Sequence, residues 1–141
     1  MCLTRSWGIL YLTILLISCG SQSSADQLAK ELQTVASWIA TAHMVGKAWN
    51  DGNVPTPYTQ RTLQAAEESL QEEADKLTQT SKIPPNTRRT ALELLRNVKT
   101  TLGQMQPAVE GGDRTALSRQ LNQLEMQRQR VIALTKNGGH P

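Results

Sequence analysis

Four stretches of the chain repeat apolar residues at alternating spacings of three and four, which is the pattern of an amphipathic helix. The most regular stretch begins at Ser24, which matches a capping box with Gln27, and continues to about Asn50. Its apolar seam consists of Leu28, Leu32, Val35, Ile39, Ala42, Gly46 and Trp49. We therefore expect a first helix that buries one stripe along its whole length.

A second helix follows the turn-forming residues 51–53. Thr56 is expected to be its N-cap and Pro57 its first residue, because proline lacks the N–H group that has no partner at that position. The helix should end near Thr80. Its expected buried residues are Leu63, Ala66, Leu70, Ala74 and Leu77.

A third helix is predicted to begin within residues 84–86, after the connection that contains Ile83. Its core positions are Ala91 or Leu92, followed by Leu95, Val98, Leu102, Met105 and Val109. Pro107 should kink or end this helix, since a proline inside a helix costs about 3 kcal/mol.

A fourth helix should begin after the glycines at 111–112, with Asp113 as its N-cap, and end near Lys136. Its seam is predicted to contain Leu117, Leu121, Leu124, Arg128, Val131 and Ile132. An unpaired charge in a buried seam is costly. We therefore expect Arg128 to turn outward or to pair with Glu31, Glu73 or Glu93.

Four amphipathic helices joined by short links bury their stripes against one another, which predicts an antiparallel up-down-up-down four-helix bundle over residues 24–137. Residues 138–141 are expected to be a flexible tail. The chain contains no Phe and few aromatic residues, so its core must consist mainly of aliphatic side chains. This topology places the start of the first helix, the 83–86 connection and the C-terminus at one end of the bundle.

The N-terminus has a different pattern: an apolar run of 11 residues, Trp7 to Ile17, follows a single basic residue. A bilayer-spanning helix needs about 20 apolar residues, so the run is typical of a secretory signal. It ends in Leu16, Ile17, Ser18 and Cys19. This motif resembles the lipobox of bacterial lipoproteins, in which a small residue precedes the modified cysteine.

The lipoprotein resemblance implies cleavage of a signal peptide (1–18) and attachment of lipid to Cys19, with residues 19–23 as a lipidated tether. It places the domain on the non-cytoplasmic, periplasmic side of the cell membrane or outer membrane, and Gly20 after the cysteine favours the outer membrane. An ordinary signal peptide or an uncleaved anchor are the alternatives. The combination of lipid anchor and helical bundle is similar in architecture to some cyanobacterial extrinsic photosystem proteins, with which the chain shares no motif.

Charge is distributed unevenly between the two halves of the chain. Residues 20–83 contain 5 basic and 8 acidic side chains, whereas residues 84–141 contain 9 and 4. We expect the acidic second helix to pair with Arg89, Arg96 and Lys99 of the third. The net charge of +3 gives no support for nucleic-acid binding. At the lipid-side end, Lys30, Lys82, Arg88, Arg89 and Lys136 are candidates for contact with anionic headgroups.

Candidate metal ligands are few. His43 lies at the edge of the first seam, and Met105 could face it from the third helix. Glu68, Glu72 and Asp75 share the outward face of the second helix, where they are either a weak cation site or a solvated surface. The common hydrolase, nucleotide-binding and zinc-protease motifs are missing, so we expect neither an enzyme nor a bound cofactor.

Aromatic residues gather around the first helix and the loop that follows it. Trp38, Trp49 and Tyr58 are candidates for a partner-binding surface, because such surfaces are enriched in Trp and Tyr. They could equally close the open end of the bundle. Two hypotheses follow: a non-enzymatic, lipid-anchored module that binds or scaffolds an envelope protein, or a periplasmic carrier of a metal or small ligand that uses His43 with Met105 or the acidic face.

Overall fold

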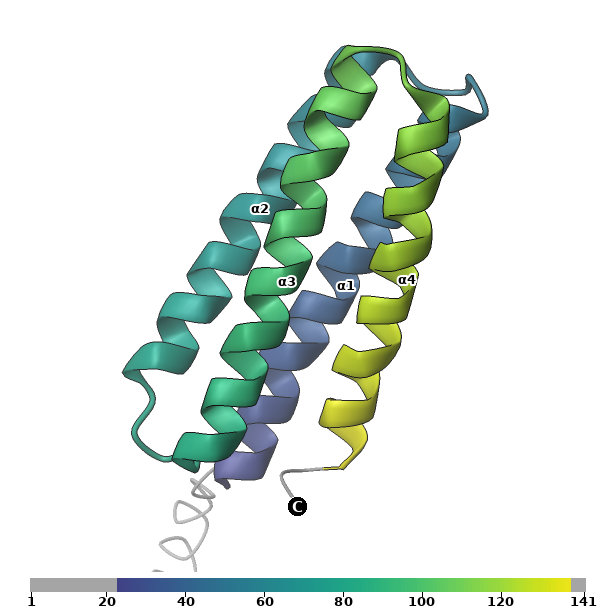
Figure 1. Cartoon of the computed structure of the whole chain (residues 1–141). Helices are drawn as coiled ribbons and strands as arrows, with labels where there is room; N and C mark the ends of the chain where they lie inside the picture. Colours follow the sequence, from purple (N-terminus) through teal and green to yellow (C-terminus); the bar gives the residue numbers. More distant parts are fainter. Residues whose placement is uncertain (1–22, 138–141) are drawn as a thin grey trace, which may run out of the picture.

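The computed structural model describes residues 23–137, and within them the chain forms four helices. These are α1 (Ser24–Asn50), α2 (Thr56–Gln79), α3 (Pro85–Glu110) and α4 (Arg114–Lys136). Each helix packs against the next and α4 packs against α1, which closes an antiparallel bundle (Figure 1). The predicted all-α, up-down-up-down four-helix bundle is confirmed. The predicted signal peptide, Cys19 with the tether up to residue 22, and the tail from residue 138 lie outside the described residues.

The core is aliphatic, as the composition requires. The seven predicted seam residues of α1 are all buried, and so are the leucines predicted for α2 and α4. In α3, Ala91 and not Leu92 is the buried residue of that pair. Ala74 and Ile132, which were predicted to be buried, are half-buried. The largest fully buried side chains are Leu32, Val35, Ile39, Leu63, Leu70, Leu77, Ile83, Leu95, Leu102, Met105, Leu117 and Leu124. Each such side chain contributes about 1.5–3 kcal/mol when it is removed from water, so this layer is the main source of stability.

The start of α1 is one residue earlier than the capping pattern suggests. Ser23, rather than Ser24, is the N-cap, and its Oγ accepts a hydrogen bond from the backbone N–H of Asp26 at 3.2 Å. Gln27 does not reach back to the cap. Its side-chain amide donates to Thr80 Oγ1 instead, which links the start of α1 to the end of α2. The predicted capping box is therefore wrong.

The start of α2 also differs from the prediction, whereas that of α4 agrees. Pro55 is the N-cap of α2 and provides no side-chain hydrogen bond. Thr56 is already helical, and its Oγ1 accepts a hydrogen bond from the indole N–H of Trp49 at 2.9 Å. In α4, Asp113 is the N-cap as predicted, and its Oδ1 accepts from the N–H of Ala116 at 2.9 Å.

Pro107 does not end α3, which continues to Glu110. Proline has no N–H group, so the carbonyl of Gly103, one turn earlier, lacks its usual hydrogen bond within the helix. The helix stops instead at Gly111 and Gly112, and Gly112 has a φ of 69°, in the left-handed region that glycine adopts without strain. The stop is therefore set by the glycines and not by the proline.

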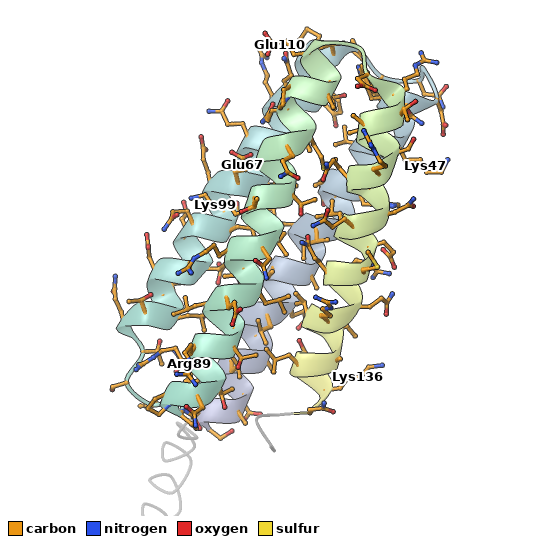
Figure 2. The ribbon with its side chains drawn as sticks, viewed as in Figure 1. Lys47, Glu67, Arg89, Lys99, Glu110 and Lys136 are labelled. Atoms are coloured by element: carbon orange, nitrogen blue, oxygen red, sulfur yellow. The ribbon has the colours of Figure 1, made fainter. Side chains whose placement is uncertain are left out.

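The two ends of the bundle have different contents. One end, here the terminal end, holds the start of α1, the α2–α3 connection and the end of α4, while the opposite, distal end holds the α1–α2 and α3–α4 connections (Figure 1). Arg89 and Lys136 lie at the terminal end, and Lys47 and Glu110 lie towards the distal end (Figure 2). Within residues 23–137, no helix is both long and apolar enough to cross a membrane.

Candidate functional site

At the distal end, Trp49 holds the α1–α2 connection in place. Its side chain is buried in the core, with 9 % of the residue exposed, and its indole N–H is bonded to Thr56. The connection turns at Gly52, which has a φ of 79°. Trp49 thus positions the α1–α2 connection, and most of its ring is not available to a partner.

Tyr58 differs from the two tryptophans because 57 % of it is exposed. It stands in the first turn of α2, directly after the connection that Trp49 fixes. Trp38 is half-buried, packs against the core, and lies three helical turns before Trp49, about 16 Å along the axis. The structure therefore does not bring the three aromatic residues into one patch, and Tyr58 is the one that the distal end presents to solvent.

His43 and Met105 occupy different environments. Met105 is fully buried, and its Cε would lie 2.9 Å from a Cβ added at Gly46. His43 is half-buried on α1, within electrostatic reach of Glu125 on α4. Within residues 23–137, no three His, Cys, Asp or Glu side chains are grouped so that they could hold a metal ion.

The acidic face of α2 is a solvated surface. Glu68, Glu72 and Asp75 are all exposed. Gln64 donates to Glu68 at 3.0 Å, and Gln71 donates to Asp75 at 2.9 Å, each across one helical turn. These hydrogen bonds occupy two of the three carboxylates with neighbours from their own helix.

The acidic α2 does not pair with the basic α3 as we expected. The ion pairs within residues 23–137 are Lys47–Asp51, Lys76–Glu31, Lys76–Glu73 and Arg128–Glu125, and none joins α2 to α3. Lys99 donates instead to the neutral amide of Gln71. Glu67 is near Lys99 (Figure 2), and its pKa is raised by burial against a weaker, opposing effect of the lysine charge. Three cations of α3 are exposed to solvent, namely Arg89, Arg96 and Lys99.

Arg128 pairs within its own helix and not with the three glutamates that we considered. Its Nε and Nη2 each donate to a carboxylate oxygen of Glu125 at 2.8 Å. This fork, together with a hydrogen bond from Gln129, lowers the pKa of Glu125 to about 2. The predicted seam position of Arg128 is wrong, because the neighbouring Gln127 is the residue that α4 turns into the core.

Gln127 is a buried polar residue that the sequence pattern missed. It is 5 % exposed, and its side-chain amide donates to Thr101 Oγ1 at 2.9 Å and to the backbone carbonyl of Asn97 at 3.2 Å. Thr101 in turn donates to the same carbonyl. The Oε1 atom of Gln127 has no hydrogen-bond partner. This network fixes the register of α4 against α3.

Glu73 is the second buried polar residue that was missed. It is 4 % exposed in the seam of α2, and the ammonium of Lys76 donates to its Oε1 at 2.7 Å. Its other oxygen is buried without a partner. Glu31 of α1 lies beside it, and the contact between the two carboxyl groups raises the pKa of Glu31. The hydrogen bond that Lys76 donates to Glu73 raises the pKa of Lys76.

The terminal end carries the cations predicted to face a membrane. Lys82, Arg89 and Lys136 are exposed there, while Arg88 donates to the backbone carbonyl of Thr80 at 2.8 Å and so caps the end of α2. A shallow groove on α3 is lined by Pro85, Arg88, Arg89, Leu92, Glu93 and Arg96. Arg88 is thus partly structural, and the other cations remain candidates for headgroup contact.

Comparison with known proteins adds no relative from which a role could be transferred. No protein-family model matches this chain, and neither does a curated protein or a solved structure. The functional interpretation therefore depends on the described residues and on the N-terminal motif.

Proposed function

We propose that this protein is a non-enzymatic, lipid-anchored module of the cell envelope that binds a protein partner at its distal end. The observation that carries the proposal is the exposure of Tyr58 in the first turn of α2, directly after the connection that the Trp49–Thr56 hydrogen bond holds in place. A large aromatic side chain held on a fixed backbone loses little conformational entropy on binding, which is the property of interface anchors.

The position of the predicted anchor suits this arrangement. Cys19 precedes the first helical residue, Ser24, by five residues, so a lipid attached there would hold the terminal end close to a membrane. The 27 residues of α1 then raise the distal end by about 40 Å. A partner that projects from the same membrane, on its non-cytoplasmic side, is the kind of protein that this end would reach.

The carrier hypothesis has less support in the described residues. His43 is half-buried on α1, Met105 is enclosed by aliphatic side chains, and the acidic face is occupied in part by glutamine amides. We therefore keep the carrier only as an outcome of the test below.

Photo-crosslinking in native membranes tests the proposal. A photo-reactive amino acid replaces Tyr58 in the full chain, and the matched control carries it at Met44, which is 66 % exposed on α1. We expect a specific protein crosslink from position 58, weak or none from position 44, and loss of the crosslink in a Cys19→Ala background. Equal labelling from both positions, or none from either, would contradict the proposal, and metal or haem binding by the purified domain would favour the carrier.

A further inference from the structure

The outer surface of α4 carries a second regular stripe, away from the core. Arg119, Gln123, Met126 and Arg130 follow one another at spacings of four, three and four, so they lie on one face of the helix. We refer to these four residues as the α4 stripe. With Asn122 and Gln127 they line a groove of about 380 Å³. The stripe therefore has the shape and spacing that a neighbouring helix requires.

The two arginines of the stripe are not engaged by carboxylates. Within residues 23–137, neither Arg119 nor Arg130 belongs to an ion pair, whereas Arg128 on the opposite flank of α4 is held by Glu125. Eleven residues separate them, which is three turns or about 16 Å. Each guanidinium can bind a carboxylate through two parallel hydrogen bonds.

Between the arginines the stripe is apolar at its centre. Met126 is 58 % exposed, and it is one of only three large apolar side chains exposed within the described part of the chain, with Met44 and Tyr58. Methionine adapts its shape to the side chain that it contacts, which makes it common on binding surfaces. An occupant of the groove would therefore place an apolar residue at its middle.

Gln127 forms the inner edge of the groove. Its side chain is buried, and its amide donates to Thr101 and to the carbonyl of Asn97 on α3. This edge of the groove is therefore held in place by the core.

We propose that the α4 stripe binds an acidic helical segment of a partner protein. The segment carries two carboxylates three turns apart for Arg119 and Arg130, and an apolar side chain against Met126. This surface lies on the side of the bundle, and it is separate from Tyr58 at the distal end. Failure of one surface therefore leaves the other intact.

Two other occupants fit the stripe less well. A second copy of this chain offers carboxylates on α2, but the exposed residues around them, such as Gln64 and Gln71, are polar and leave Met126 without an apolar partner. An anionic membrane would face the terminal end, whereas the stripe runs along the bundle and starts near the distal end, at Arg119. Charge complementarity and the central apolar contact together favour a protein helix.

Binding of a designed peptide to the full chain tests the inference. The probe is an alanine-based helical peptide with two glutamates three turns apart and a leucine midway, and the control peptide has the same composition in scrambled order. We expect the ordered peptide to bind about tenfold more tightly than the scrambled one. Raising NaCl from about 0.05 to 0.5 M should weaken this binding.

Charge reversal locates the site. The double variant Arg119→Glu, Arg130→Glu should lose peptide binding by about tenfold or more. The matched control, Arg61→Glu with Arg96→Glu, changes the net charge equally at exposed positions on α2 and α3 and should bind within about twofold of the wild type. Circular dichroism checks that both variants keep their helices.

Several results would overturn the inference. Equal binding of both peptides, or equal loss in both variants, would show that only net charge matters. Self-association in light scattering that the α4 reversal abolishes would assign the stripe to a second copy. Loss of binding to phosphatidylserine vesicles, with peptide binding unchanged, would assign it to a membrane. Met126→Ala gives a further check, because it should weaken binding of the ordered peptide several-fold without changing the salt dependence.

Discussion

Two large polar side chains are buried in the core of the bundle, Glu73 in α2 and Gln127 in α4, and they are held differently. Gln127 is neutral and donates two hydrogen bonds to α3. Glu73 is a carboxyl group, and its contacts are an exposed lysine and a second carboxyl group, that of Glu31. A neutral amide bonded to backbone fixes helix register at little cost, whereas a buried carboxylate depends on a partner that solvent competes for.

Replacing Gln127 by Glu and Glu73 by Gln should change the free energy of unfolding in opposite directions, and the larger change is expected at Gln127. Gln127→Glu places a carboxylate against the Thr101 hydroxyl and the Asn97 carbonyl, where a donor is needed. We expect the free energy of unfolding at pH 7 to fall by about 3 kcal/mol, because the charge is buried without a cation. Urea denaturation measures this loss. Most of it should disappear near pH 4, and an equal loss at both pH values would mean that charge is not the cause.

The reverse exchange, Glu73→Gln, should stabilise the protein. The amide oxygen keeps the hydrogen bond from Lys76, and the amide nitrogen can donate to Glu31 in place of two carboxyl groups in contact. We expect a gain of about 1 kcal/mol in the free energy of unfolding at pH 7. Glu68→Gln on the exposed face is the control and should change stability little. A loss in Glu73→Gln would show that the charged pair with Lys76 is needed.

The effect of Glu31→Gln on stability should depend on pH, which tests the role of the Glu31–Glu73 contact. The pKa of Glu31 is raised in the folded state, so the folded protein takes up a proton before the unfolded chain does as pH falls. Wild-type stability should therefore rise as pH falls through that raised pKa towards about 4.5. The variant should be more stable than the wild type at pH 7, with the difference vanishing near pH 4.5. A pH-independent difference in urea midpoints would contradict this explanation.

The smallest effect is expected from Glu125→Gln in α4. The folded pKa of Glu125 is lowered to about 2 by the fork from Arg128, so its contribution is present above pH 4.5 and is lost as pH falls towards 2. Thermal melts between pH 5 and 2 should show a shallower acid loss in the variant than in the wild type. Identical acid slopes would indicate that the exposed pair contributes nothing measurable, as many surface pairs do.

The sequence pattern predicted the aliphatic layer well but missed the buried polar residues, of which Glu73 and Gln127 are the largest. In each case the predicted seam was one position away: Ala74 in place of Glu73, and Arg128 in place of Gln127. A helical stripe spans more than one residue per turn, so spacings of three and four are both compatible with it. Only the packing of neighbouring helices decides which residue points inward. A prediction that assigns apolar residues to the core therefore fails where the inward residue is itself polar.

The candidate surfaces, too, could be predicted only in part from the sequence. Tyr58 could be nominated from its residue type and from the loop beside it. The burial of Trp49 follows from its seam position, but spacing does not reveal the hydrogen bond from its indole N–H to Thr56. The α4 stripe could have been seen as a second periodicity in the sequence. Its importance appears only when Arg119 and Arg130 are found to form no ion pair within residues 23–137 and Met126 is found to be exposed between them.

The contact between α1 and α4 gives the bundle the topology of a ring, because every helix has a neighbour on both sides. In such a ring the packing of the helices does not depend on where the chain begins. The chain could therefore be opened at any of the connections. A circular permutant that joins the end of α4 to the start of α1 and opens the turn at Gly52 should retain the same core. Its new ends would then emerge beside Tyr58, about 40 Å from the place where the natural chain enters the bundle.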